Sequence, residues 1–65
     1  MKQFIVYVMV SDIDTTVAVE RAHSIMKEKL ENLSVKIVSI STTSAVAPDA
    51  YIFTISAVVE KDENE

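Results

Sequence analysis

The stretch FIVYVMV, residues 4–10, places seven consecutive apolar residues in a chain of only 65 residues. Its β-branched and aromatic side chains fit the pleated surface of a strand, so a strand is predicted over residues 3–10. A strand with one face in water alternates apolar and polar residues, and this stretch does not alternate. Both of its faces therefore need cover, either from the same chain or from another one.

A helix is predicted directly after this strand, over residues 15–33. Asp14 is the expected N-cap, because a carboxylate at that position accepts hydrogen bonds from backbone N–H groups of the first turn. Ile13 is expected to pack on Ala18 as a hydrophobic staple. Because the chain has no Gly, Asn32 is the expected left-handed cap at the other end. The apolar arc of the helix contains Ala18, Val19, Ala22, Ile25, Met26, Leu30 and Leu33.

Two further strands are predicted after the helix. The first starts at residue 35 and ends at residues 43–45, and the second covers residues 51–60; the turn Ala47-Pro48-Asp49-Ala50 joins them. The last strand should lie between the other two, antiparallel to both. The predicted fold class is α+β, a single β-α-β-β domain over residues 1–59 with one helix on one face of a three-stranded, mainly antiparallel sheet. An acidic, mobile tail is expected over residues 60–65.

One helix can bury one face of this sheet, which leaves the other face uncovered. On the first strand the uncovered set is either Ile5-Tyr7-Met9 or Phe4-Val6-Val8-Val10. Since each fully buried Val, Ile or Phe contributes roughly 1.5–3 kcal/mol, an exposed set of this kind marks an association site. We expect a homo-oligomer, a dimer or larger. The candidate interface residues are Ile5, Tyr7, Met9, Ile52 and Val58.

The composition excludes the usual means of stabilising a very small domain. A chain of this length buries only about 60% of its unfolded surface and is marginal alone. It contains no Cys and a single His, so neither a disulfide nor a His- or Cys-based metal site is expected. No cofactor is expected, and oligomerisation is the stabilising factor that remains.

The net charge of −4 comes mostly from the C-terminal end, where residues 60–65 contain four acidic residues and one basic residue. The rest of the chain is nearly neutral and has no basic stripe, so no nucleic-acid partner is expected. A membrane span needs about 20 apolar residues, a run that the sequence does not contain. We therefore expect a soluble, cytoplasmic protein.

Few residues have the spacing of a catalytic or metal site. His23 could act as a base with Glu20 three residues away, but an ordinary histidine at the border of the apolar arc is the simpler interpretation. Glu28 and Glu31 lack a third ligand at helical spacing and are interpreted as a solvated face. Asp12 and Asp14 are explained by helix capping. We therefore expect that the protein is not an enzyme.

Two further groups of residues could bind a ligand. Residues 39–44 are rich in hydroxyl groups, but phosphate-binding loops use Gly, and a solvent-facing strand fits better. Tyr7, Tyr51 and Phe53 could stack a ring ligand, although packing in the core or at an interface explains them as well.

The layout of the chain is similar to that of the dodecins, small flavin-binding proteins that assemble into hollow shells. An initial strand, a helix from SDIDTT (residues 11–16) to LENL (residues 30–33) and two long strands carry the resemblance. Dodecins stack the flavin on a Trp near the start of the second strand and hold it with a Gln. Here Val35 and Lys36 begin that strand, the chain has no Trp, and its one Gln is Gln3.

Two hypotheses for the function follow. The first is a small non-enzymatic protein–protein interaction module that acts as a homo-oligomer. Its role would be regulatory or accessory, as in small proteins of this kind that include phage-encoded ones. The alternative, implied by the resemblance, is a dodecin-like oligomer that binds and stores an aromatic small molecule of the flavin type between its subunits.

Overall fold

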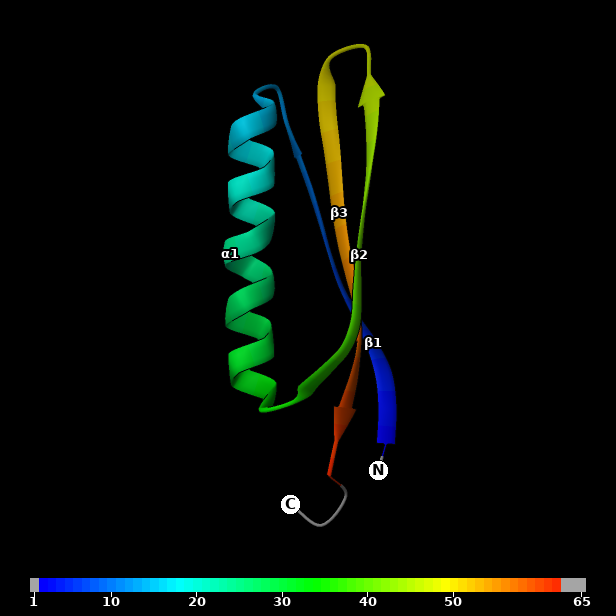
Figure 1. Cartoon of the computed structure of the whole chain (residues 1–65). Helices are drawn as coiled ribbons and strands as arrows, with labels where there is room; N and C mark the ends of the chain where they lie inside the picture. The colour runs from blue at the N-terminus through cyan, green and yellow to red at the C-terminus, as the bar shows by residue number, and fades with distance from the viewer. Residues whose placement is uncertain (1, 63–65) are drawn as a thin grey trace.

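The computed structural model describes residues 2–62 and has the predicted β-α-β-β order (Figure 1). Its elements are β1 (Lys2–Asp12), α1 (Thr15–Leu33), β2 (Lys36–Ala47) and β3 (Ala50–Lys61). β3 lies between β1 and β2 and is antiparallel to both, so the α+β fold class is confirmed. β3 includes Glu60 and Lys61, while residues 63–65 of the expected tail lie outside the described residues.

The core lies between α1 and the pair formed by β1 and β3. In the register of these strands Val8 lies opposite Ile55 and Val6 opposite Ala57, and directly opposite residues share a face of a sheet. This face packs on Ala18, Ala22 and Met26 of α1. The buried apolar residues are Val6, Val8, Val10, Ala18, Ala22, Met26, Ile55, Ala57 and Val59. The core is small, because its largest fully buried side chains are Ile55 and Val59.

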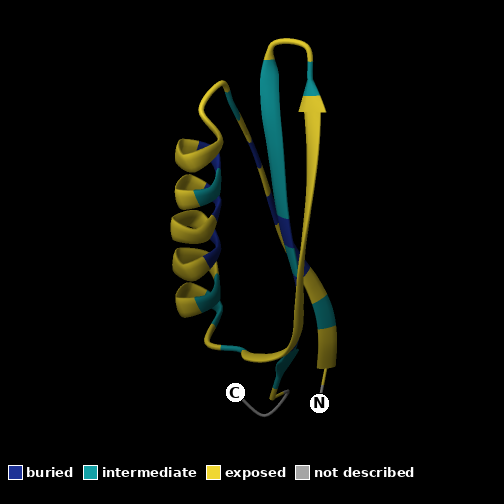
Figure 2. Ribbon diagram, turned by 45° about the horizontal axis from the view of Figure 1, so that its top comes forward, coloured by how far each residue is buried: buried dark blue, intermediate teal, exposed yellow. Residues whose placement is uncertain are grey.

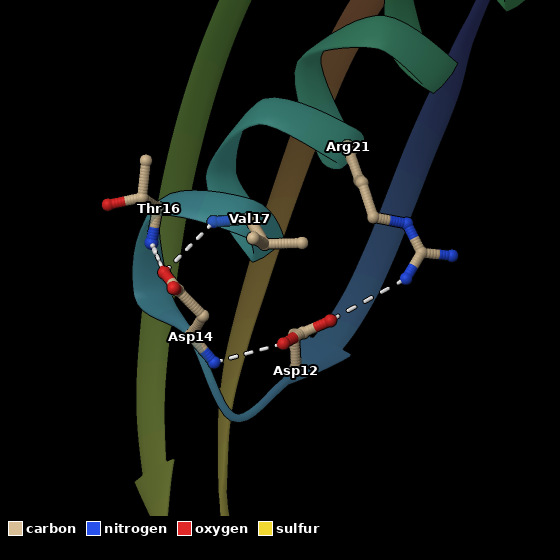
Figure 3. Close-up of polar contacts among 5 residues, drawn as sticks. All are labelled: Asp12, Asp14, Thr16, Val17 and Arg21. Carbon is tan, nitrogen blue, oxygen red and sulfur yellow. Dashed lines mark hydrogen bonds and ion pairs between the residues drawn. The ribbon is translucent and has the colours of Figure 1, made fainter.

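The start of α1 is fixed by two aspartates (Figure 3). Asp14 Oδ1 accepts hydrogen bonds from the backbone N–H groups of Thr16 at 2.9 Å and Val17 at 3.3 Å, as predicted for the N-cap. Asp12 Oδ1 accepts from the backbone N–H of Asp14 at 2.9 Å, and Asp12 Oδ2 lies 3.7 Å from Arg21 Nη1. The predicted staple is wrong: Ile13 is 86% exposed, because the turn closed by Asp12 directs it away from Ala18.

The helix ends at Leu33 as predicted, but its left-handed cap lies two residues beyond the predicted one. The left-handed residue is Ser34, with φ 54° and ψ 54°, and its N–H donates to the carbonyl of Leu30 at 3.1 Å. Asn32 as the cap was therefore wrong. Leu33 packs against the core, which keeps Asn32 within the last helical turn and moves the cap beyond it.

The lateral position of α1 decides which strands are covered. α1 packs on β1 and β3 and makes no recorded contact with β2 within the described residues. All of β2 from Lys36 to Val46 is exposed (Figure 2). Ile25, expected in the buried arc, is also exposed, because it lies beside the β1–β3 pair rather than over it.

Replacing Asp14 should destabilise the fold through the loss of the cap. Asp14→Ala removes the acceptor for two N–H groups and should lower the free energy of unfolding by about 0.5–2 kcal/mol. Asp14→Ser keeps an acceptor and should lose much less. Urea unfolding followed by circular dichroism, at one fixed protein concentration, measures both variants. Equal losses in the two variants would contradict the capping role.

Replacing Ser34 tests the left-handed cap. Because a residue with a Cβ pays a steric penalty in that conformation, Ser34→Gly should raise the free energy of unfolding by about 0.5–1 kcal/mol. Ser34→Val should lower it, since a β-branched residue tolerates positive φ poorly. The same unfolding measurement checks both changes, and a Gly variant less stable than the wild type would refute the explanation.

Candidate interaction surface

The face of the sheet opposite α1 is uncovered, and we call it the open face. Because Val6 and Val8 point toward α1, the alternate residues of β1 point the other way. Ile5, Tyr7 and Met9 are 68%, 62% and 63% exposed. Of the two sets that the sequence left open, Ile5-Tyr7-Met9 is thus the outward one.

The structure brings the five candidate interface residues onto this same face. Ile5 lies opposite Val58 in the register of β1 with β3, and Ile52 lies opposite Ser11 at the other end. Ile52 and Val58 are half-buried, since β3 has a neighbour on each side. By register the open face contains Ile5, Tyr7, Met9 and Ser11 of β1, Ile52, Thr54, Ser56 and Val58 of β3, and Ser39, Ser41, Thr43 and Ala45 of β2.

The open face carries no charged side chain over this area. Charges occur at one end, where Glu60 lies opposite Lys36 and its Oε1 accepts a hydrogen bond from Gln3 Nε2 at 2.8 Å. Ser41 and Ser56 bond to each other through their hydroxyl groups at 3.0 Å. The surface is apolar along β1 and hydroxyl-rich along β2, and no charge on it opposes contact with another apolar surface.

β2 is a second uncovered region: residues 39–44 are exposed, as predicted for a solvent-facing strand, and the helix side of the strand is exposed as well. On the helix side of the sheet Ile40 is 57% exposed and Val46 is 84% exposed, because α1 does not extend over β2. The hydroxyl-rich residues 39–44 lie in this strand and alternate between its two faces. A helix about 10 Å wide covers two strands spaced about 4.8 Å apart. One helix on a three-stranded sheet therefore leaves one strand uncovered.

Lys29 of α1 lies beside the edge of β1. Together with Asn32 and Leu33 it lines an open hollow with the N-terminal part of β1, formed by Phe4, Ile5, Val6 and Tyr7. Lys29 itself is exposed, and a lysine beside an apolar hollow can cover it with its methylene stem while its ammonium group remains in water.

His23, the candidate catalytic residue, packs at the border of the helix. Its Nδ1 donates a hydrogen bond to the carbonyl of Val19 at 2.8 Å, and its ring lies on Phe53 with a centroid distance of 5.9 Å and an interplanar angle of 28°. Tyr51 also stacks on Phe53, with a centroid distance of 6.4 Å. Tyr7 does not join these rings, because it lies on the open face.

The acidic residues considered as ligands have local roles or lie in solvent. Asp12 and Asp14 cap α1, while Glu28 and Glu31 are exposed on its outer surface. Within residues 2–62 no three His, Cys, Asp or Glu side chains gather where they could hold a metal ion. No helix in that range is long and apolar enough to cross a membrane.

Comparisons with protein-family models, with curated proteins and with solved structures gave no match to this chain. The surfaces described above are therefore interpreted from their own chemistry.

Proposed function

We propose that this chain is a small non-enzymatic protein–protein interaction module of the cytoplasm, regulatory or accessory in role, that acts as a homo-oligomer. The open face is its self-association surface. The observation that carries the proposal is the row of three large apolar side chains on β1, Ile5, Tyr7 and Met9, each 62–68% exposed on a surface without charge.

The energetics of the isolated chain support a partner for this face. Burying Ile5, Tyr7 and Met9 would contribute roughly 1.5–3 kcal/mol each, while a small domain has a total stability of about 5–15 kcal/mol. Three of the buried residues, Ala18, Ala22 and Ala57, contribute little apolar area to the core. Within the described residues only six larger buried side chains hold the core together, so the three left in water on the open face are a large addition to what a partner could bury.

The shape of the chain also supports association. Its accessible surface is 4694 Å², whereas a compact monomer of 7.2 kDa should expose about 4,100 Å². Its radius of gyration is 13.4 Å, against about 10.7 Å for a compact domain of this length. The excess surface, roughly 600 Å², approaches the roughly 800 Å² that each partner buries in a stable interface.

A second copy of the same chain is the partner that fits the open face best. The face is long and neutral, so two copies meet without like charges opposing each other. A two-fold axis through it would bury the same apolar row twice, once from each copy. Additional protein partners would then bind to the assembled form.

Charge introduced into the open face should weaken the assembly. We expect the wild-type protein to have a molar mass above the 7.2 kDa of one chain, and Ile5→Lys to lower that mass at equal concentration. Losing two buried isoleucines across a two-fold axis should weaken the contact by at least about 100-fold. Size-exclusion chromatography with light scattering over a dilution series measures both quantities.

Ile13→Lys is the matched control for this experiment. It makes the same chemical change at a more exposed isoleucine that lies in the turn before α1, off the open face. Its molar mass should equal that of the wild type. A wild-type chain that stays folded and monomeric at high concentration, or equal effects of the two substitutions, would overturn the proposal.

A second candidate function is the dodecin-like binding and storage of an aromatic small molecule between subunits. The stacked rings of His23, Phe53 and Tyr51 favour it, because such a row offers a ring surface to a planar ligand. Titration of riboflavin, followed by its fluorescence, separates the two functions. Quenching that Phe53→Leu abolishes would support storage, and unchanged fluorescence would exclude flavin binding.

A further inference from the structure

We propose that the outer edge of β2 pairs antiparallel with β2 of a second copy, with the two Thr43 residues opposite each other at a two-fold axis. Two chains would then share one six-stranded sheet. This contact uses the backbone groups at the edge of β2, whereas the proposed function uses the apolar side chains of the open face, so it does not depend on the proposed function.

The edge of β2 lacks the features that normally prevent strand pairing. Edge strands are usually protected by charged side chains, prolines, bulges or a covering element. In β2 a charge, Lys36, and a register shift between Ile37 and Ser39 occur at the beginning of the strand. The nine residues 39–47 that follow carry neither charge nor proline, and α1 makes no recorded contact with them.

The other edge of the sheet, formed by β1, is protected from strand pairing by cationic side chains of α1. Arg21 reaches the C-terminal end of β1, where its guanidinium lies 3.7 Å from the carboxylate of Asp12 (Figure 3). Lys29 lies beside Phe4 and Tyr7 at the N-terminal half. A strand approaching β1 would meet both side chains, whereas a strand approaching β2 meets none.

The symmetry of an antiparallel pair restricts its register. Along an antiparallel pair, hydrogen-bonded and non-hydrogen-bonded pairs alternate, and two residues that lie opposite each other are of the same kind. Two identical strands related by a two-fold axis perpendicular to the sheet meet this condition only where one residue lies opposite its own copy on the axis. Thr43 is the central residue of the segment 39–47, so an axis at Thr43 pairs all nine of its residues, whereas an axis at the neighbouring Thr42 pairs seven.

The side chains favour Thr43 over Thr42. With Thr43 on the axis, Ile40 lies opposite Val46 of the second copy, which pairs the two exposed apolar residues on the helix side of the segment 39–47. Thr42 then lies opposite Ser44. With Thr42 on the axis, Ile40 would instead face Ser44, and Val46 would face the second copy's Val38, the bulged residue.

The charges at the two ends of β2 are complementary in the same register. The antiparallel arrangement places the beginning of β2, which carries Lys36, near the Pro48-Asp49 turn of the second copy, so that an ammonium group and a carboxylate approach each other once at each end of the pair. Opposite charges at the ends add specificity, and the segment between them contains no charge that repels its copy.

This pairing ends after two chains. A contact between identical edges uses the same surface on both copies, so it is complete once two chains have paired. The protected edge of β1 then ends the sheet on each side. Both helices lie on one face of the six-stranded sheet, and the two open faces join into one wider surface on the other side.

Single cysteines test the register directly, because the natural chain has no Cys. Paired Cα atoms lie about 4.5–5.5 Å apart in an antiparallel ladder, within the range of a disulfide. Thr43→Cys should therefore form a covalent dimer under mild oxidation. Thr42→Cys should form it at least about ten-fold more slowly, since its equivalent Cα atoms would be offset to about 8 Å. Ser24→Cys, on the outer surface of α1, gives the background rate.

The experiment is repeated in the Ile5→Lys variant, which separates this contact from the open face. The edge pairing is supported if Thr43→Cys cross-links faster than Ser24→Cys both with the natural Ile5 and in the Ile5→Lys variant. This result would stand even if the open-face proposal fails. Cross-linking at residue 43 no faster than at Ser24, or fastest at residue 42, overturns it.

A charge on the axis gives a second test, which is made in the Ile5→Lys protein because Thr43 also belongs to the open face. Thr43→Lys places two ammonium groups directly opposite each other, which destabilises a strand pair. Ile5→Lys alone should have twice the mass of one 7.2 kDa chain, and adding Thr43→Lys should reduce it to one chain. Adding Ser24→Lys instead should leave the mass unchanged. A monomeric Ile5→Lys protein at the concentration used for cross-linking would refute the pairing.

Discussion

The width of a single helix is the constraint on which the whole structure depends. A helix about 10 Å across covers two strands of a sheet, and the sheet described over residues 2–62 has three. α1 lies over β1 and β3, so the residues of these strands that face it form the core. Everything beyond its reach, which is the opposite face of the sheet and all of β2, remains in water.

The position of α1 follows from small side chains and from its two ends. Ala18 and Ala22 are fully buried, which lets the helix backbone come close to the sheet at Ala57. Asp12, the last residue of β1, closes the turn into the helix, and Asp14 caps its first turn. Ser34 ends the helix and leads the chain into β2 beyond the covered strands. The turns before and after α1 thus place β2 at the edge of the sheet that the helix does not cover.

The two uncovered surfaces differ in chemistry and favour different contacts. The open face offers large apolar side chains and gains most from face-to-face packing, while the edge of β2 offers backbone groups and small hydroxyl side chains suited to strand pairing. If both contacts form, two six-stranded sheets stack with their helices on the outside. In such an assembly each chain of 65 residues gains the second layer of cover that it cannot supply itself.

The sequence by itself determined the element order, the bounds of α1, the cap at Asp14 and the presence of apolar residues on both faces of β1. These depend on neighbours along the chain, where capping and periodicity act. The tertiary structure alone decided that Ile5, Tyr7 and Met9 point outward, that Ile13 leaves the core, that Ser34 rather than Asn32 is the cap, and that β2 lies bare. The reason is that coverage depends on where the helix sits across the sheet, and that position is set by contacts between residues far apart in the sequence.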